Sequence, residues 1–190
     1  MRRRDLLGGL LVLLGSGVVA RRAQALGGTL PSLDQPAPAF RLDGVVPGSG
    51  DGEIQSQRLR LSDFAGRWLV LYFYPKDFTE GCTLEARGFQ RDLDRFRERN
   101  AEVVGISADD GDAHASFCGS EGLAYPLLSD PTGEVSRLYG SWIAPFSQRH
   151  TFLIDPQGVL RARWTAVRPA GHSREVLAEL DRIRAGGASA

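Results

Sequence analysis

The sequence has very few of the residues and motifs that mark several common chemistries. Among its 190 residues are only two cysteines, Cys82 and Cys118, too few for a disulfide-rich miniprotein or a four-cysteine zinc site. No CxxC, HExxH, P-loop or GxGxxG motif occurs, so the short motifs of dithiol, zinc-protease and nucleotide chemistry are absent. Lys76 is the only lysine, the formal net charge is zero, and no basic stretch lies outside the N-terminus. These features argue against nucleic-acid binding.

The remaining composition is that of an ordinary globular protein. Apolar residues make up 42% of the chain and charged residues 24%, which is typical of a protein that buries a core. This argues against disorder, a collagen-like repeat, a long coiled coil and a multi-span membrane protein. A length of 190 residues suits one domain, or one domain and a short processed segment.

The first 25 residues have the layout of an export signal. Residues 2–4 are arginines and precede an uncharged run over 6–20, which as a helix would span about 22 Å, short of a hydrocarbon core of about 30 Å. Ala23-Gln24-Ala25 is a small-x-small site that suits signal peptidase. We therefore predict that residues 1–25 form a signal peptide, with an uncleaved anchor helix as the alternative.

The order of residues in this segment favours one export route. Arg3-Arg4-Asp5-Leu6-Leu7 resembles a twin-arginine signal, so this route is favoured over the general one. Cleavage after Ala25 would leave an exported protein without stable membrane association, in the periplasm or, in a photosynthetic host, in the thylakoid lumen. Outside the reducing cytosol the two cysteines could form a disulfide.

Apolar patterning predicts one α/β domain after a short leader. Proline and glycine residues make 26–39 an extended leader, and 40–190 form the predicted domain. Strands are predicted at 68–74, 102–107, 125–128, 150–154 and 159–164, helices at 83–99, 110–121, 130–139 and from Ser173 to about 184, and a loop or loose hairpin at 43–57. The order of these elements predicts a central mixed sheet flanked by helices.

Residues 75–83 join the most apolar strand to the following helix and carry one of the cysteines. Cys82 lies at or just inside the helix N-terminus, where free backbone N–H groups and the helix dipole favour negative charge. A thiol in this place loses its proton more easily, and the thiolate is the nucleophile. Pro75 ends the strand and shields one side of the site, and the Thr79 hydroxyl is expected to turn back toward the sulfur. The alternative is a buried, inert cysteine.

The sequence of this connection, Pro-Lys-Asp-Phe-Thr-Glu-Gly-Cys-Thr over 75–83, resembles the peroxiredoxin active-site motif Pro-x-x-x-Thr-x-x-Cys. Its form is that of the Q-type, or bacterioferritin comigratory protein, branch. The resemblance covers roughly residues 36–184. Outside the motif it is carried by residues 61–66, 104–107, 127–130 and 149–155. It implies a thioredoxin-like fold, no metal or organic cofactor, and a monomer that reduces hydrogen peroxide or organic hydroperoxides and is recycled by a thioredoxin-like donor.

The resemblance also implies a set of catalytic residues. Cys82 matches the peroxidatic cysteine, and Thr79 and Pro75 match its pocket partners. Arg149 matches the arginine that points at the thiolate and the peroxide. A permanently charged guanidinium there would favour the thiolate and stabilise charge that develops on the leaving oxygen. Without the resemblance, Arg149 would be interpreted as a surface arginine at the start of a strand.

A sulfenic acid on Cys82 would have to be resolved by a second thiol. In the commonest Q-type pattern the resolving cysteine lies five residues after the peroxidatic one, and that position here is Arg87. Cys118 is the other cysteine, and some Q-type members resolve with a cysteine on that helix. We therefore predict an intramolecular Cys82–Cys118 disulfide, which needs Cα atoms within about 7 Å and local unfolding if they start farther apart. The alternative is an external resolving thiol.

Other residues receive more modest expectations. The three histidines are too widely spaced to predict a metal site: His114, His150 and His172. Glu85 is expected to favour the helix start rather than to contact the pocket. Hydrophobic packing is expected, rather than a place at the pocket mouth, for Tyr139, Trp142 and Phe146.

Two other functional classes stay open. One is an exported thiol–disulfide exchange protein, against which the missing CxxC argues. The other is a non-catalytic thioredoxin-fold module with a structural disulfide.

Overall fold

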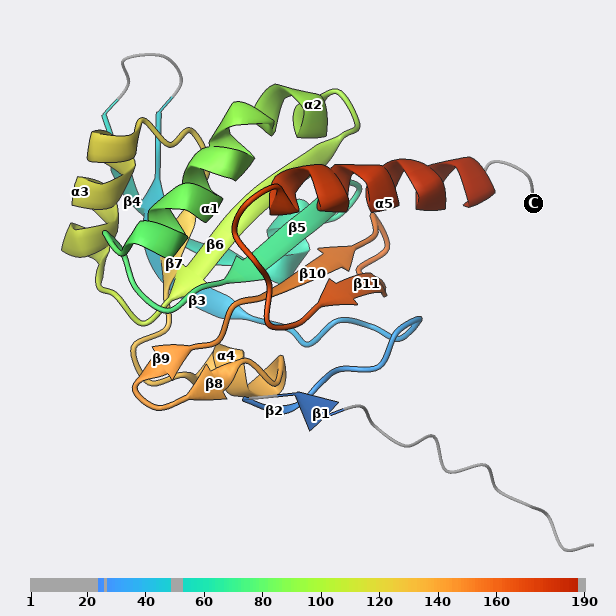
Figure 1. Cartoon of the computed structure of the whole chain (residues 1–190), viewed down its shortest axis with the longest axis horizontal. Coiled ribbons are helices and arrows are strands. Elements are labelled where there is room, and N and C mark those ends of the chain that lie inside the picture. The colour runs from blue at the N-terminus through green and yellow to red at the C-terminus, as the bar shows by residue number, and fades with distance from the viewer. Residues whose placement is uncertain (1–23, 26, 49–52, 188–190) are drawn as a thin grey trace, which may run out of the picture.

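A computed structural model of the chain describes residues 24–25, 27–48 and 53–187 (Figure 1). The strands are β1 (Gln24–Ala25), β2 (Gly28–Thr29), β3 (Arg41–Val46), β4 (Gln55–Arg60), β5 (Trp68–Phe73), β6 (Ala101–Ser107), β7 (Leu127–Ser129), β8 (Trp142–Ile143), β9 (Phe146–Ser147), β10 (His150–Ile154) and β11 (Leu160–Trp164). The helices are η1 (Leu61–Phe64), α1 (Glu80–Arg91), α2 (Leu93–Arg97), α3 (Gly111–Glu121), α4 (Glu134–Leu138) and α5 (His172–Gly187).

Seven of these strands form one mixed sheet in the order β11-β10-β5-β6-β7-β3-β4. The pairs β5–β6 and β6–β7 are parallel, and the other neighbours are antiparallel. Parallel neighbours need crossover connections, which α1 with α2 and then α3 supply. The predicted central mixed sheet with flanking helices is confirmed.

Strand β5 lies in the middle of the sheet because both of its faces are apolar. Val70 and Tyr72 point into one buried cluster with side chains of α1, α2, α3 and α5, and Leu71 and Phe73 point into a second cluster with η1 and α4. Each of these four side chains is at most 1% exposed, and burial of such a side chain stabilises the fold by about 1.5–3 kcal/mol. Both cysteines belong to the first cluster, which lies between the sheet and the helices α1, α2, α3 and α5. Figure 1 shows these helices on one face of the sheet.

The helix predicted at 83–99 is in fact two helices with a break at Asp92. The Asp92 carboxylate is buried and accepts hydrogen bonds from the Ser173 hydroxyl at 2.6 Å and from Arg91 at 2.6 Å. The backbone of Asp92 (φ −97°, ψ 6°) leaves the helical region so that this contact can form. Ser173 was predicted to cap the last helix. It lies inside the first turn instead, because α5 begins at His172.

The helix predicted at 130–139 is shorter than expected. It begins at Glu134 after Gly133, whose φ of 71° favours glycine. Asp130 still prepares this start, because its carboxylate accepts hydrogen bonds from the N–H groups of Val135 and Ser136 at 3.4 and 2.7 Å. The predicted start at Asp130 is therefore four residues too early, because a turn closed by the bond from Gly133 N–H to the Asp130 carbonyl precedes the helix.

The N-terminal predictions are only partly open to structural description. The export signal predicted at 1–25 lies outside the described residues except for Gln24 and Ala25. The part of the leader that is described packs onto the domain through Leu30 and Ala37. The loop or loose hairpin expected at 43–57 belongs to the paired strands β3 and β4. No helix in the described part of the chain is long and apolar enough to cross a bilayer.

Candidate active site

The segment between β5 and α1 places Cys82 in the first turn of a helix. Thr79 is the last extended residue before α1, and its carbonyl accepts the N–H of Thr83 at 2.9 Å. The N–H groups of the residues between them, including Cys82, therefore lie at the helix end where no intrahelical acceptor precedes them. Cys82 is a free thiol and only 1% exposed. A negative charge on its sulfur would meet the positive end of the helix dipole.

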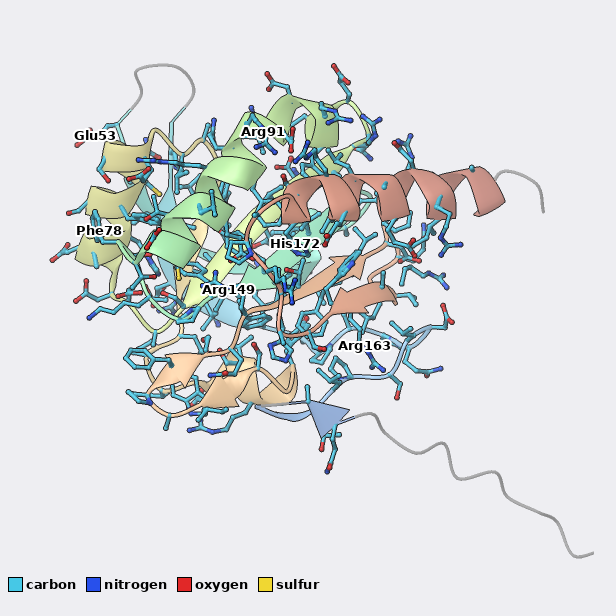
Figure 2. All side chains as sticks on the ribbon, in the orientation of Figure 1. Glu53, Phe78, Arg91, Arg149, Arg163 and His172 are labelled. Atoms are coloured by element: carbon cyan, nitrogen blue, oxygen red, sulfur yellow. The ribbon has the colours of Figure 1, made fainter. Side chains whose placement is uncertain are left out.

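A guanidinium from a different part of the chain lies against this sulfur. Arg149 immediately precedes β10, and its Nη2 donates to Cys82 Sγ at 3.3 Å. In Figure 2 Arg149 lies beneath the start of α1. Gly81 permits this approach, because a Cβ at that position would be 3.2 Å from Arg149 Nη2. The arginine named from the sequence is thus brought to the cysteine named from the sequence.

The same guanidinium also contacts a buried carboxylate, Glu85. Arg149 Nη1 donates to Glu85 Oε2, and Glu85 Oε1 has no hydrogen-bond partner among the described residues. Burial raises the pKa of Glu85 to about 7, and the charge and hydrogen bond of Arg149 limit that rise. The expectation that Glu85 only favours the helix start is wrong. Because Glu85 lies one turn after Cys82 on α1, it orients the arginine that contacts the sulfur.

Pro75 and Thr79 lie in the loop between β5 and α1, and neither side chain is hydrogen-bonded to Cys82. Pro75 follows β5 and is half-buried, as expected for a residue that ends the strand. Thr79 is exposed, and its hydroxyl donates to the carbonyl oxygen of Lys76 at 3.0 Å. The expected bond from this hydroxyl to Cys82 is therefore not formed, because its one proton is used within the turn.

Cys118 lies in the last turn of α3 and is also a free, buried thiol. Burial raises the pKa of Cys118 to about 12, and the carboxylate of Asp77 adds to the rise. Its sulfur shares the first apolar cluster with Cys82. The disulfide between the two residues stays a prediction.

More than half of the chain matches a known protein family. Residues 33–163 match the AhpC/TSA family. The chain belongs to the AhpC/TSA family.

Individual relatives place the chain near one branch of this family. The peroxiredoxin Bcp of Xanthomonas campestris is 38% identical over 157 residues, which cover 78% of this chain and 93% of that protein. A structure of the bacterioferritin comigratory protein of that organism, described for its alkyl peroxide reduction activity, has a TM-score of 0.67 at 32% identity and covers 75% of this chain and 90% of its own. The resemblance to Q-type peroxiredoxins and the thioredoxin-like fold are both confirmed.

Another relative is named for its reductant. The mitochondrial thioredoxin-dependent peroxide reductase of Drosophila melanogaster is 38% identical over 150 residues, which cover 74% of this chain and 62% of that protein. The match shows that the similarity extends beyond the Q-type branch to other peroxiredoxins.

In this AhpC/TSA-family chain, two buried polar residues near the cysteines were not recognised from the sequence as a pair. Asp77 lies in the loop before α1, and His114 lies on α3. Their side chains meet, with His114 Nδ1 2.8 Å from Asp77 Oδ2. The sequence carried one weak signal of this arrangement, since His114 precedes Cys118 by one helical turn.

The three aromatic residues for which packing was expected differ in how far they are buried. Tyr139 is buried between Phe73 and Phe152, and its hydroxyl donates to the carbonyl of Pro38 at 2.7 Å, so its packing role is clear. The Trp142 ring lies under the guanidinium of Arg137, 5.2 Å from its carbon. Phe146 is 42% exposed. In the described part of the chain, no three His, Cys, Asp or Glu side chains gather as they would around a metal ion.

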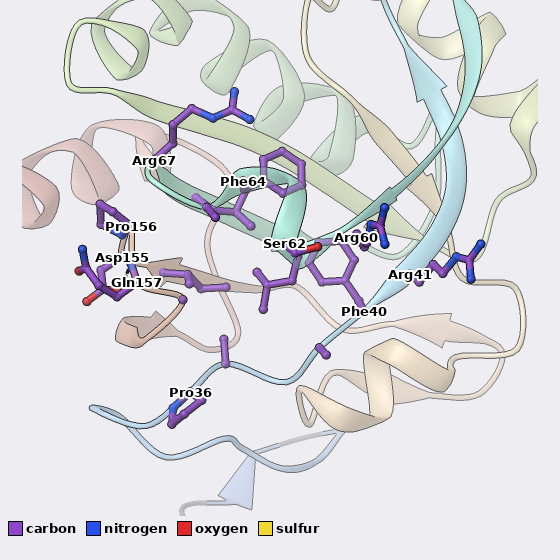
Figure 3. Close-up of a pocket in the computed structure, with 17 residues that line it drawn as sticks. Pro36, Phe40, Arg41, Arg60, Ser62, Phe64, Arg67, Asp155, Pro156 and Gln157 are labelled. Carbon is purple, nitrogen blue, oxygen red and sulfur yellow. Dashed lines mark hydrogen bonds between the residues drawn. The ribbon is translucent and has the colours of Figure 1, made fainter.

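The apolar pocket of Figure 3 is separate from this chemistry. It has a volume of about 490 Å³, and no cysteine or histidine lines it. Among its lining residues are Phe40, Leu61, Phe64, Leu69 and Ile154. Leu69 is near the amino end of β5, whereas Cys82 follows the carboxyl end, so about 13 Å of strand lies between the pocket residue and the end that leads to the thiol.

Proposed function

We propose that the protein is a thiol-dependent peroxidase in which Cys82 attacks the peroxide. The Cys82 thiolate would bond to one peroxide oxygen while the O–O bond breaks, giving a sulfenic acid and a hydroxide or alkoxide that takes up a proton. The observation that carries the proposal is the contact between Arg149 Nη2 and Cys82 Sγ at a helix N-terminus. Both features favour negative charge on the sulfur and on the departing oxygen.

The substrates we propose are hydrogen peroxide and organic hydroperoxides. Support comes from the Xanthomonas relative described for alkyl peroxide reduction. The placement of Arg149 also fits a substrate recognised through its two oxygen atoms, because a guanidinium has several donors in one plane. No metal or organic cofactor is needed for this step, since the sulfur supplies both electrons that reduce the peroxide.

Cys118 is the proposed resolving thiol. Its thiol would condense with the sulfenic acid of Cys82, forming the S–S bond and releasing water. Because each cysteine is only 1% exposed and Cys118 is held as the neutral thiol, we infer that α1 or α3 must open locally before the disulfide forms. A thioredoxin-like donor would then reduce the disulfide, and support comes from the Drosophila relative, which is named a thioredoxin-dependent peroxide reductase.

The proposal extends to the organisation of the whole chain. Residues 1–25 would direct export to the periplasm or a thylakoid lumen, 26–39 would form the leader, and 40–190 would be the catalytic domain. The mature protein is proposed to act as a monomer.

Intact mass and free-thiol count test the mechanism directly. The reduced protein would be measured before and after one equivalent of hydrogen peroxide. We expect both thiols to disappear with the loss of two hydrogen atoms, which is the signature of an intramolecular disulfide. Oxygen added to Cys82 with Cys118 still free would instead show a one-cysteine peroxidase. No reaction at all would contradict the peroxidase proposal and leave a module without peroxide chemistry.

A further inference from the structure

The loop that carries the peroxidatic motif is fastened to α3 by one buried carboxylate. Asp77 Oδ2 lies 2.8 Å from His114 Nδ1, and Asp77 Oδ1 accepts the Tyr74 hydroxyl at 2.7 Å. The backbone N–H of Asp77 donates to Asp109 Oδ2 at 2.9 Å, just before α3. Asp77 is 3% exposed and His114 is fully buried. These bonds are the polar link between the loop before α1 and the helix of the second cysteine.

The link is placed where it can control Cys118. His114 precedes Cys118 by four residues on α3, so both side chains lie on the same side of the helix. Between them Phe117 packs edge-on against Phe78 of the loop, with ring centroids 5.1 Å apart (Figure 2 labels Phe78 beside α3). The face of α3 that holds Cys118 is thus the face that contacts the loop, so the bond between His114 and Asp77 would restrain movement of Cys118.

Two local features of the contact between the loop and α3 are unfavourable in free energy. His114 Nε2 is buried and has no hydrogen-bond partner among the described residues. Phe78, adjacent to Asp77, has a φ of 60°, which is unfavourable for a residue with a side chain. Opening would release the backbone of Phe78 and expose His114 to water, which can satisfy both ring nitrogens. The Asp77–His114 bond opposes these two costs and keeps the loop and α3 together.

We propose that the Asp77–His114 contact is the latch that sets the rate at which α3 opens and delivers Cys118 to the sulfenic acid of Cys82. His114 is then a positioning residue for the resolving step and does not touch the reacting atoms. The inference rests on the proposed function, in which Cys118 resolves Cys82. It goes further by naming the contact that limits this step.

A latch of this kind sets a competition between two fates of the sulfenic acid. Condensation with Cys118 gives a disulfide and water, whereas attack of the sulfenate on a second peroxide gives a sulfinic acid and water or an alcohol. A tighter latch lengthens the lifetime of the sulfenic acid and so favours its oxidation to the sulfinic acid. A broken latch favours the disulfide.

The test compares two substitutions at one position. His114→Leu keeps much of the side-chain volume but cannot bind Asp77. His114→Asn places an amide nitrogen near the position of Nδ1 and can donate to the carboxylate. After mixing with hydrogen peroxide and quenching with an alkylating reagent, intact mass gives the rate of disulfide formation. We expect His114→Leu to form the disulfide about tenfold faster than the unmodified protein, the scale of one hydrogen bond to a charged group, and His114→Asn to restore a rate close to it.

Two matched controls separate the latch from general loosening. Glu121→Gln removes the charge of Glu121 from its pair with the exposed Arg87, which also joins α1 to α3, and is expected to change the rate less than His114→Leu because glutamine can still accept the Arg87 bond. Ile154→Val destabilises the opposite face of the sheet and tests whether lowered stability alone accelerates resolution. Thermal unfolding of all four variants allows the rates to be compared at known stability.

Two further readouts make the outcome decisive. In His114→Leu, the peroxide concentration that converts half of Cys82 to sulfinic acid should rise about tenfold. In a Cys82→Ser background, where no peroxide chemistry occurs, His114→Leu should speed alkylation of Cys118. Unchanged alkylation of Cys118, or a disulfide that forms no faster in His114→Leu than in Ile154→Val, would overturn the latch. If the unmodified protein forms no disulfide although Cys118 is alkylated faster in His114→Leu, the resolving role of Cys118 fails and the structural latch stands.

Discussion

The two cysteines are equally buried, yet the charges beside them have opposite signs. Cys82 and Cys118 are each 1% exposed and belong to the same apolar cluster. Cys82 lies in the first turn of α1 and accepts a hydrogen bond from Arg149. Cys118 lies in the last turn of α3, and the charge beside it is the carboxylate of Asp77. One thiol therefore has a positive helix end and a guanidinium, and the other has a negative helix end and a carboxylate.

This difference shows that charge rather than exposure distinguishes the proposed roles of the two thiols. Burial removes both sulfurs from water to the same extent. Arg149 donates a hydrogen bond to the Cys82 sulfur, whereas burial and then the carboxylate of Asp77 raise the pKa of Cys118 to about 12. With this pKa Cys118 is a neutral thiol in the structure, and under the proposed mechanism it would become reactive when α3 opens. Such an arrangement would keep the resolving thiol from reacting with peroxide itself.

Replacing each cysteine in turn by serine should reveal the largest difference between the two thiols. Cys82→Ser is expected to lower peroxide reduction by on the order of 10³-fold or more, because the nucleophile is gone and a serine hydroxyl is not ionised there. Cys118→Ser should leave the first reaction with peroxide within about threefold of the unmodified protein, because Cys118 contributes no charge to Cys82 while it is a neutral thiol. Stopped-flow peroxide consumption by reduced protein, one equivalent at a time, measures both.

The two serine variants also control for each other. They remove the same atom from the same apolar cluster, so a shared loss of packing would affect both alike. Equal loss of the first reaction in Cys118→Ser would show that the two thiols are not functionally distinct, and the charge argument would fail.

Substitutions of Arg149 should have the next largest effect, on the rate at which Cys82 reacts with peroxide. Arg149→Leu is expected to slow the reaction of Cys82 with peroxide by about 10²- to 10³-fold, which is the loss seen when one donor to a developing oxyanion is removed. Arg149→Lys keeps the charge but cannot bridge Cys82 and Glu85 with two nitrogens, so an intermediate loss is expected. Single-turnover rates in the Cys118→Ser background measure this step alone.

Cys118 is the internal control for the arginine variants. Its alkylation rate in a Cys82→Ser background should not change on Arg149→Leu, because Arg149 is not among the groups that shift its pKa. A similar change at both thiols would mean that Arg149 acts through the stability of the fold and not through the charge at Cys82.

Much of the first half of this comparison could be predicted from the sequence. An apolar strand that ends at a proline, followed by an amphipathic helix, places Cys82 at a helix N-terminus from local rules alone. The strand at 150–154 was predicted with the bounds that the structure has, and Arg149 directly precedes it. The contact of Arg149 with Cys82 required the resemblance, because no local pattern states which strand pairs with β5.

The surroundings of Cys118 and the other buried polar pairs depend on contacts between elements that are distant in the sequence. Asp77 and His114 are 37 residues apart and meet only because β6 and β7 bring α3 beside the loop. Glu85 was assigned to the helix start because its position on α1 explains it locally, and its burial against Arg149 becomes visible only with β10 in place. The break at Asp92 has the same origin, since Ser173 reaches it from α5. Buried polar pairs are the part of the site that patterning cannot place.

The smallest expected effect concerns the carboxylate that shares Arg149 with Cys82. The pKa of Glu85 is raised to about 7, so Glu85 changes from mostly neutral to mostly charged as the pH rises from 6 to 8. When Glu85 is charged it competes with Cys82 for the charge of Arg149 and weakens the stabilisation of the leaving oxygen. We expect Glu85→Gln to remain neutral, to keep accepting the Arg149 bond, and to react about threefold faster than the unmodified protein at pH 8 but equally fast at pH 6.

Single-turnover rates of Cys82 oxidation across this pH range, in the Cys118→Ser background, measure the difference. Glu85→Leu is the contrasting variant, because it removes the acceptor that orients the guanidinium and should be slower than Glu85→Gln at every pH. A pH profile of Glu85→Gln that keeps the inflection near 7 would assign that inflection to another group. If Glu85→Leu matched Glu85→Gln, the carboxylate would affect Cys82 only through its charge, and the orientation of Arg149 would have to come from the backbone around Gly81 and β10.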